Sequence, residues 1–314
     1  MKIIGIGTSK FLAAALTGFK EVGWEISGII SLKEKLLPDN SYNLKEFSST
    51  HKCSYYETSN INSLSTVQYI SRLKPDLIFS CWPRIITSNQ LLKNFRIIGT
   101  HPTSLPINRG RHPVQWMITQ GIKESKLSFF LIGSGIDTGN IILQLPFKIS
   151  KNADINNINS ILNKLAERGS RKIALDIIKR NRIHSRKQNN NNANYWRKKD
   201  RHDVLIDFRM REREISSIIR SFTLPYPCSF FIYNDNIIRV KECRVIKNLS
   251  LKVKNIEPGK IIKINKRSII VKCQDAAIKL TVIEDLSKIK FGKYIFPPTK
   301  YIVRYTKLKN FFYI

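Results

Sequence analysis

The chain has 314 residues and a formal net charge of +31 at pH 7, with 42% hydrophobic and 25% charged residues. A chain of this length can bury a sizeable core, and its apolar content excludes wholesale disorder. No apolar run reaches the roughly 18–20 residues of a membrane span, and the N-terminal segment has no secretory cleavage pattern, so we expect a soluble cytoplasmic protein. The five cysteines are scattered and form no C-x-x-C pair, which predicts neither a disulfide framework nor a metal site.

The first part of the chain alternates short apolar runs with segments of helical periodicity. Strands are predicted at residues 2–7, 24–31, 76–81, 96–99 and 127–132, a strand pair at 141–149, and helices at 11–19, 67–73, 114–120 and 155–179. Near-continuous apolar strands that alternate with helices are typical of a parallel sheet covered on both faces. We therefore predict an α/β fold with a Rossmann-like, mostly parallel sheet.

The second part of the chain has a different pattern. The polar tract at residues 188–194 (QNNNNAN) has too little apolar content to pack and is interpreted as a linker. After it come a short helix at 215–219 and strands at 229–233, 237–240, 260–264, 268–273 and 277–283. Short strands at this spacing predict a small antiparallel, OB-like β-barrel. The predicted domains are 1–188, a linker at 189–194, and 195–314.

The excess of basic residues has two interpretations. A basic surface can neutralise the phosphates of a nucleic acid or of a nucleotide-linked substrate. Alternatively, the chain is rich in Lys, Ile and Asn, the residues with A/T-only codons, and the excess reflects genomic drift. Because the excess runs through both parts of the chain and does not cluster, drift is favoured over a nucleic-acid footprint.

The segment 99–113 (GTHPTSLPINRGRHP) directly follows a predicted buried strand and holds two of the five histidines. Ligands of open parallel sheets bind at the carboxyl ends of strands, where this segment emerges. Asp137 ends the next predicted strand, and a carboxylate there can orient His101 and raise its pKa. Taken singly, His101 is more simply a half-buried structural histidine and Asp137 an Asx-turn residue. At two consecutive strand ends, the pair predicts an active site.

These segments resemble the signatures of one enzyme family. Residues 101–110 (HPTSLPINRG) resemble the H-x-S-L-L-P-x-x-R-G motif of the folate-dependent formyltransferases, and residues 136–139 (IDTG) resemble their D-T-G or D-S-G motif. Residues 195–198 (YWRK), 203–207 (DVLID) and 225–227 (PYP) resemble the start of that family's C-terminal domain. The resemblance covers the chain from Met1 to about Glu284.

The resemblance implies transfer of a formyl group from N10-formyltetrahydrofolate, as co-substrate, to a primary amine. It assigns proton removal and oxyanion binding to His101, and support of that histidine to Asp137. It places the folate along Trp82, Arg84, Ile85, Leu105, Pro106, Ser134, Ile136 and Asp137.

One position departs from the family pattern. The family has asparagine two residues before the histidine, and this chain has Gly99 there, so one oxyanion donor is missing. Thr100, Asn108 or a water replaces that donor, or the chemistry is impaired. Thr100 and Asn108 are therefore included among the candidate catalytic residues.

The acceptor is predicted from the residues after Gly110. Arg111, His112, Pro113 and Trp116 resemble formyltransferases of nucleotide-linked amino sugars more than methionyl-tRNA formyltransferases, and Arg109, Arg111 and His112 are assigned to substrate binding. A structural role for Arg111 is about as plausible. The loop at 32–42, basic in the tRNA enzymes, has two lysines offset by two carboxylates here. We predict an amino-sugar N-formyltransferase of surface glycan biosynthesis, with no membrane partner. Methionyl-tRNA as acceptor, a binding protein without turnover, and a homodimer are left open.

Overall fold

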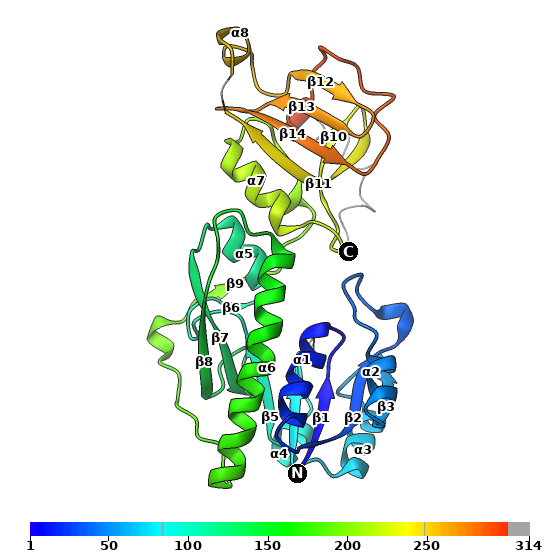
Figure 1. The fold of residues 1–314 in the computed structure, drawn as a ribbon, viewed down its shortest axis with the longest axis vertical. Helices are drawn as coiled ribbons and strands as arrows, with labels where there is room; N and C mark the ends of the chain where they lie inside the picture. The colour runs from blue at the N-terminus through cyan, green and yellow to red at the C-terminus, as the bar shows by residue number, and fades with distance from the viewer. Residues whose placement is uncertain (83–84, 248, 301–314) are drawn as a thin grey trace. The chain divides into compact units, whose positions relative to one another are not determined.

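The computed structural model describes residues 1–82, 85–247 and 249–300 (Figure 1). The chain divides into two compact units. Unit 1 comprises residues 1–113, 123–150 and 156–197, and unit 2 comprises 114–122, 151–155 and the chain from Lys198 onward. Two short internal segments, 114–122 and 151–155, thus belong to the same unit as the C-terminal part of the chain. A single domain boundary in the sequence cannot describe this arrangement.

Unit 1 is built on a seven-stranded sheet with the order β3-β2-β1-β4-β5-β7-β8. Its strands are β1 (Lys2–Ile6), β2 (Glu25–Leu32), β3 (Ser54–Thr58), β4 (Leu77–Ser80), β5 (Ile97–His101), β7 (Glu124–Leu131) and β8 (Ile141–Lys148). The first five run parallel, whereas β7 is antiparallel to β5 and β8 is antiparallel to β7. The mostly parallel α/β fold predicted from the sequence is confirmed.

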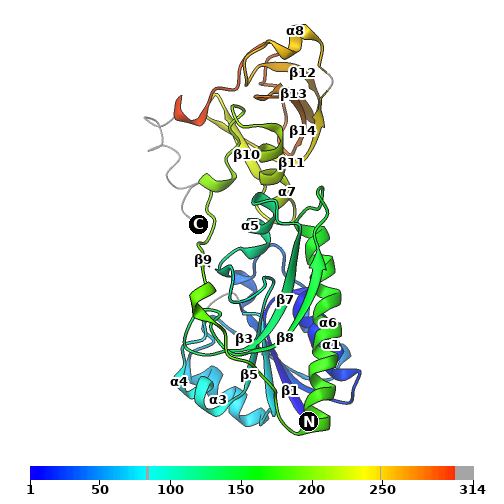
Figure 2. The same cartoon turned by 90° about the vertical axis from the view of Figure 1, so that its left-hand side faces the viewer.

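Helices cover both faces of this sheet. They are α1 (Lys10–Lys20), α2 (Leu44–Thr50), α3 (Leu64–Leu73), α4 (Asn89–Asn94) and α6 (Ile155–Arg180). The helix α5 (Pro113–Thr119) falls almost wholly within unit 2. In Figure 2, α1 and α6 lie on one side of the sheet and α3 and α4 on the other. Gly18 permits the close approach of α1 to α6, because a Cβ at this position would overlap the carbonyl oxygen of Glu167.

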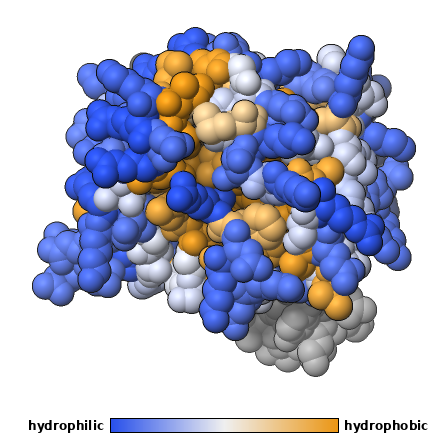
Figure 3. All heavy atoms as spheres, turned by 90° about the horizontal axis from the view of Figure 1, so that it is seen from below, coloured by the Kyte–Doolittle hydropathy of each residue, from blue (hydrophilic) through white to orange (hydrophobic). Residues whose placement is uncertain are grey.

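One cluster of the unit 1 core has buried members that are all aliphatic. It joins isoleucines of the parallel strands to the inner residues of α3 and α4. Its strand members include Ile4, Ile6, Ile30, Ile78 and Ile97, and its helix members include Val67, Ile70 and Leu91. Burial of each of these side chains contributes about 1.5–3 kcal/mol to the stability of the folded chain. It also fixes the positions of the strand ends from which the loops of the site begin. On the face shown in Figure 3, hydrophilic side chains surround smaller hydrophobic patches.

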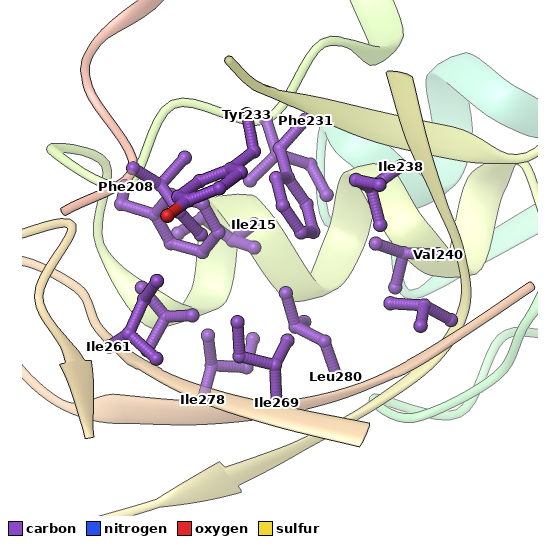
Figure 4. Packing of buried hydrophobic residues seen from close by; sticks show 14 of the residues in the cluster. Phe208, Ile215, Phe231, Tyr233, Ile238, Val240, Ile261, Ile269, Ile278 and Leu280 are labelled. Carbon is purple, nitrogen blue, oxygen red and sulfur yellow. The ribbon is translucent and has the colours of Figure 1, made fainter. Parts of the chain in front are cut away.

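Unit 2 contains a five-stranded antiparallel sheet with the order β10-β11-β14-β13-β12. Its elements are α7 (Glu212–Ser221), β10 (Ser229–Tyr233), β11 (Asn236–Ile246), α8 (Leu251–Lys254), β12 (Ile261–Asn265), β13 (Ser268–Lys272) and β14 (Ala277–Val282). Figure 4 shows Ile215 of α7 packed among Phe231, Ile278 and Leu280 from the strands. The predicted antiparallel β domain is confirmed.

Some local predictions differ from the structure. The β3 strand was not predicted, because its sequence (SYYET) is polar and it lies at the sheet edge. The predicted strand pair at 141–149 is a single strand, β8 (Ile141–Lys148). No helix among the described residues is long and apolar enough to cross a membrane.

Candidate functional site

A cavity of about 260 Å³ lies in unit 1 at the carboxyl ends of β4 and β5. Its lining comes from four segments: the end of β4 and the residues after it, the end of β5, residues 110–113, and residues 130–137. The cavity therefore lies where the sequence predicts the site.

The lining includes a buried histidine and a carboxylate. The side chain of His101 is 5% exposed, and its Nδ1 lies 3.5 Å from Oδ2 of Asp137. On the other side of the ring, Nε2 lies 2.8 Å from the carbonyl oxygen of Asn108. A proton on Nε2 therefore makes a hydrogen bond to this carbonyl, which leaves the Nδ1 lone pair on the side of Asp137.

Burial controls the charge of this histidine. Desolvation lowers the pKa of His101 below its ordinary value, while the Asp137 carboxylate and the Asn108 carbonyl act in the opposite direction. Since burial is the largest of these effects, the resting imidazole is neutral at pH 7. A neutral imidazole can accept a proton, and the adjacent carboxylate stabilises the imidazolium that results.

Asp137 reaches His101 by a route that the sequence does not indicate. Because β7 is antiparallel to β5, the end of β7 at Leu131 pairs with Ile98 and not with His101. The connection from β7 to β8 folds back toward the end of β5, where Oδ2 of Asp137 accepts a hydrogen bond from the Gly110 backbone N–H at 2.9 Å. Asp137 itself has a positive φ of 54°, a conformation that costs a non-glycine residue free energy and persists only where the surroundings impose it.

Arg109 lies under the loop and not in the cavity. Its side chain is 2% exposed. Its guanidinium donates to Oε1 of Gln188 at 2.7 Å, to Oδ1 of Asn190 at 2.8 Å and to the hydroxyl of Tyr195 at 3.0 Å. The two-residue strands β6 (Arg109–Gly110) and β9 (Tyr195–Trp196) pair in parallel beside it. The predicted substrate-binding role of Arg109 has no support in this geometry.

The remaining candidate residues divide into two groups. Trp82, Ile85, Thr100, Ile136, Arg111 and His112 line the cavity together with His101 and Asp137. Leu105 is 3% exposed and packs against Phe130 and Ile141, while Pro106, Asn108 and Ser134 are not among the described lining residues. Oδ1 of Asn108 accepts a hydrogen bond from Nδ2 of Asn194 at 2.9 Å. Arg84 lies outside the described residues.

The space beside Gly99 is filled. A Cβ at this position would lie 2.8 Å from Cγ1 of Ile132 and 3.1 Å from Cζ of Phe130. Side chains alternate along a strand, so position 99 shares a face with His101, and the side chain of Thr100 points to the opposite face. Neither Thr100 nor Asn108 therefore presents its side chain where an asparagine at position 99 would.

A second hollow of about 430 Å³ lies between β8 and α6, with Ile142, Leu143 and Leu175 in its wall. Its carboxylate and its histidine each have an arginine partner, because Asp176 pairs with Arg180 at 2.7 Å and Nε2 of His184 accepts a hydrogen bond from Arg182 at 3.1 Å. The 260 Å³ cavity brings a histidine and a carboxylate together and is therefore the better candidate for the active site.

The sequence gives no sign that Gln188, Asn190, Asn194 and Tyr195 contact the loop of the site. Composition describes residues 188–194 as a flexible linker, yet this segment contains a 3₁₀ turn (Asn190–Asn192) and its side chains contact the 108–110 loop. The partners are 79 to 86 residues apart in the chain, so no local pattern signals these contacts.

Comparison with known proteins identifies the class. The model of the formyl transferase family matches residues 1–177, and the model of the formyl transferase C-terminal domain matches residues 198–292. The chain belongs to the formyl transferase family. It is therefore a folate-dependent formyltransferase, and N10-formyltetrahydrofolate is the co-substrate of this class.

Curated relatives include two kinds of protein. The chain is 27% identical over 300 residues to a methionyl-tRNA formyltransferase of Alkaliphilus oremlandii, with 93% of this chain and 94% of the relative covered. It is 26% identical to the bifunctional polymyxin resistance protein ArnA of Wigglesworthia glossinidia brevipalpis, with 94% of this chain and 46% of that protein covered.

Solved structures confirm the fold. An N-formyltransferase from Helicobacter canadensis, in complex with folinic acid and dTDP-3-aminofucose, has a TM-score of 0.64 at 18% identity, with 90% of this chain and 100% of that chain covered. Methionyl-tRNA formyltransferase from Clostridium thermocellum has a TM-score of 0.58 at 19% identity, with 90% and 99% covered.

Proposed function

We propose that this enzyme transfers the formyl group of N10-formyltetrahydrofolate to the primary amine of a nucleotide-linked amino sugar. The observation that carries the proposal is the position of Arg111 in the cavity wall. The exposed side chain of this arginine lines the cavity that holds His101 and Asp137, and no carboxylate among the described residues pairs with its guanidinium. A guanidinium grips a diphosphate in bidentate fashion. The backbone N–H of Arg111 donates to the Trp196 carbonyl at 3.0 Å, which fixes its place in the loop.

The cavity wall suits the folate co-substrate. Trp82, Ile85, Ile86, Phe130 and Ile132 provide apolar surface for a flat ring. Gly133 leaves room beside them, because no atom lies within 4 Å of a Cβ at that position. Nε1 of Trp82 is a buried donor with no hydrogen-bond partner among the described residues. Such a donor matches the polar edge of a pterin ring. When bound, the folate supplies the formyl carbon.

His101 and Asp137 would act on the attacking amine. The Nε2 proton of His101 is held by the Asn108 carbonyl, so Nδ1 would accept the proton that the amine loses as its nitrogen bonds to the formyl carbon. The resulting imidazolium then lies against Oδ2 of Asp137. This stabilises charge that develops only during the reaction, where stabilisation lowers the barrier most. The bond from the formyl carbon to N10 of the folate would break, and the imidazolium would return the proton to N10 of the leaving tetrahydrofolate.

Methionyl-tRNA is the alternative acceptor, and the curated relatives with that name support it. The loop after β2 argues against it. Lys33 and Lys35 share a surface hollow with Glu34 and Glu57, so this loop presents no uncompensated positive charge to a phosphate backbone. A binding protein without turnover is the second alternative, because the family asparagine is missing at Gly99.

The test is tetrahydrofolate release from N10-formyltetrahydrofolate with a panel of nucleotide-linked amino sugars and, in parallel, methionyl-tRNA. We expect release with a sugar and not with the tRNA, and Arg111→Ala should raise the KM for the sugar by about tenfold while the KM for folate stays constant. Arg72→Ala, at an exposed position in the last turn of α3, is the control. Release of tetrahydrofolate with the tRNA alone would overturn the proposal that the acceptor is an amino sugar. No release with either favours the binding protein. The cytoplasmic location and the homodimer stay predictions.

A further inference from the structure

Gln188 connects two loops of the site through a fully used side-chain amide. Its Oε1 accepts from Nε and Nη2 of Arg109, at 3.3 and 2.7 Å. Its Nε2 donates to the backbone carbonyls of Asp137 and Gly139, at 2.8 and 2.6 Å. The side chain is buried, and these partners fix which end of the amide is oxygen and which is nitrogen.

The cation under this amide has unusual surroundings. Arg109 is buried, and the acceptors on its guanidinium are the neutral side chains of Gln188, Asn190 and Tyr195. The Tyr195 ring centroid also lies 5.6 Å from its Cζ. A buried cation without a carboxylate must have its N–H groups satisfied by dipoles, because loss of one partner leaves charge unsolvated. The positive charge therefore holds the Gln188 oxygen, which turns the Gln188 N–H groups toward the 137–139 loop.

The loop at 137–139 needs such an anchor. Asp137 is held by its carboxylate, which accepts from the Gly110 N–H, and by its carbonyl, which accepts from Gln188. Its positive φ is a conformation that relaxes when the surrounding contacts are removed. The Oδ2 atom that lies 3.5 Å from Nδ1 of His101 thus depends on both anchors.

We propose that Gln188 is a positioning residue of the formyl-transfer site, which acts through the backbone of Asp137 and contacts neither substrate. This rests on the catalytic role of His101 and Asp137 given above. It also makes residues 188–195 a structural part of the catalytic unit, because this segment supplies the amide and the partners of the buried arginine.

Gln188→Glu separates the two functions of the amide. A glutamate keeps an oxygen for Arg109 and adds an ion pair, so the buried cation stays satisfied and the unit folds. It loses both donors to the loop and places an acceptor oxygen against two carbonyls. Asn192→Ala, which removes an exposed amide from the same segment, is the matched control.

Hydrogen exchange tests the positioning without any substrate. We expect amides of residues 132–140 to exchange faster in Gln188→Glu than in the wild type and at the wild-type rate in Asn192→Ala, because loss of the anchor lowers the local opening free energy. Unchanged exchange at 132–140 in folded Gln188→Glu would overturn the proposal. This result stands whichever acceptor the enzyme uses, so it is distinguishable from failure of the proposed function.

Kinetics test the route through Asp137 with whichever acceptor turns over. We expect Gln188→Glu to lower kcat by roughly tenfold to a hundredfold with little change in the KM for folate, since a small misplacement of a catalytic group costs rate and not binding. In an Asp137→Asn background the same substitution should cause little further loss. Losses that multiply in the double variant would show that Gln188 does not act through Asp137.

Discussion

The side chain of Ile132 occupies the space in which a side chain at Gly99 would lie, with Cγ1 2.8 Å from the position of a Cβ. The asparagine typical of the family is therefore missing, and the Ile132 side chain fills the space that its side chain would need. Gly99→Asn should destabilise the chain by about 1–3 kcal/mol, as overpacking does, and should not raise kcat. Urea denaturation and the formyl-transfer assay measure the two effects.

The matched test opens that space first. In an Ile132→Ala background, Gly99→Asn should cost less stability than in the wild type, because the two closest atoms, Cγ1 and Cδ1 of Ile132, are removed and only Cζ of Phe130 still crowds the position. It should also raise kcat relative to Ile132→Ala alone, since an amide on the face of His101 can donate to the oxyanion. An equal stability cost in both backgrounds would show that Ile132 does not close the position.

The two side chains predicted to replace the missing donor can be tested directly. Asn108 is bonded to Asn194, and Thr100 points to the face opposite His101, so we expect Thr100→Val and Asn108→Ala each to lower kcat by less than about tenfold. A water in the cavity then remains as the donor. A larger loss in Thr100→Val, with Thr100→Ser unaffected, would instead assign the donor to the Thr100 hydroxyl.

Burial of His101 predicts how stability depends on pH. Burial lowers the pKa of His101 in the folded chain below its ordinary value of about 6.5. Below about pH 6.5 the unfolded chain therefore binds a proton that the folded chain does not, so stability should fall as the pH is lowered from 7 to 5. His51, whose pKa burial also lowers, contributes with the same sign.

The measurement is the urea midpoint of unfolding between pH 5 and 7. His101→Gln should flatten the dependence partly and leave the contribution of His51. His184→Gln, at an exposed position, is the control. A wild-type midpoint that rises toward pH 5 would contradict the prediction.

The sequence predicts those parts of the fold that local patterns encode. The apolar runs at β1, β2, β4 and β5 are buried parallel strands. The spacing of apolar residues distinguishes these strands from the helices α1 and α6, in which such residues recur at helical spacing. The sequence does not predict the reversal at β7, because strand direction is set by pairing and not by the composition of the strand. The contact between His101 and Asp137 was predicted from the ends of two consecutive strands, whereas in the structure the connection from β7 to β8 folds back and brings Asp137 to His101.

The part of the site that the sequence does not indicate depends on contacts between segments that are far apart in the chain. A run of asparagines is read locally as solvated, and only the folded chain brings Asn190 and Gln188 to the guanidinium of Arg109. The resemblance to the family motif assigned Arg109 to substrate binding, whereas the structure buries its side chain. Its burial follows from the pairing of β6 with β9, which the sequence does not signal.

Gly110 links that pairing to the catalytic pair. Its φ is +107°, a Cβ would overlap the Trp196 carbonyl oxygen, and its N–H donates to Asp137. Gly110→Ala combines backbone strain with a clash against backbone that cannot rotate away, so we expect a loss of about 2–4 kcal/mol and at least a roughly hundredfold lower kcat. Gly121→Ala separates the two costs, because Gly121 has a φ of +65° with no atom within 4 Å of the added Cβ. It should lose only about 1–2 kcal/mol and keep its kcat. Thermal unfolding and the formyl-transfer assay measure both variants, and equal losses of stability would show that the Trp196 contact does not constrain this loop.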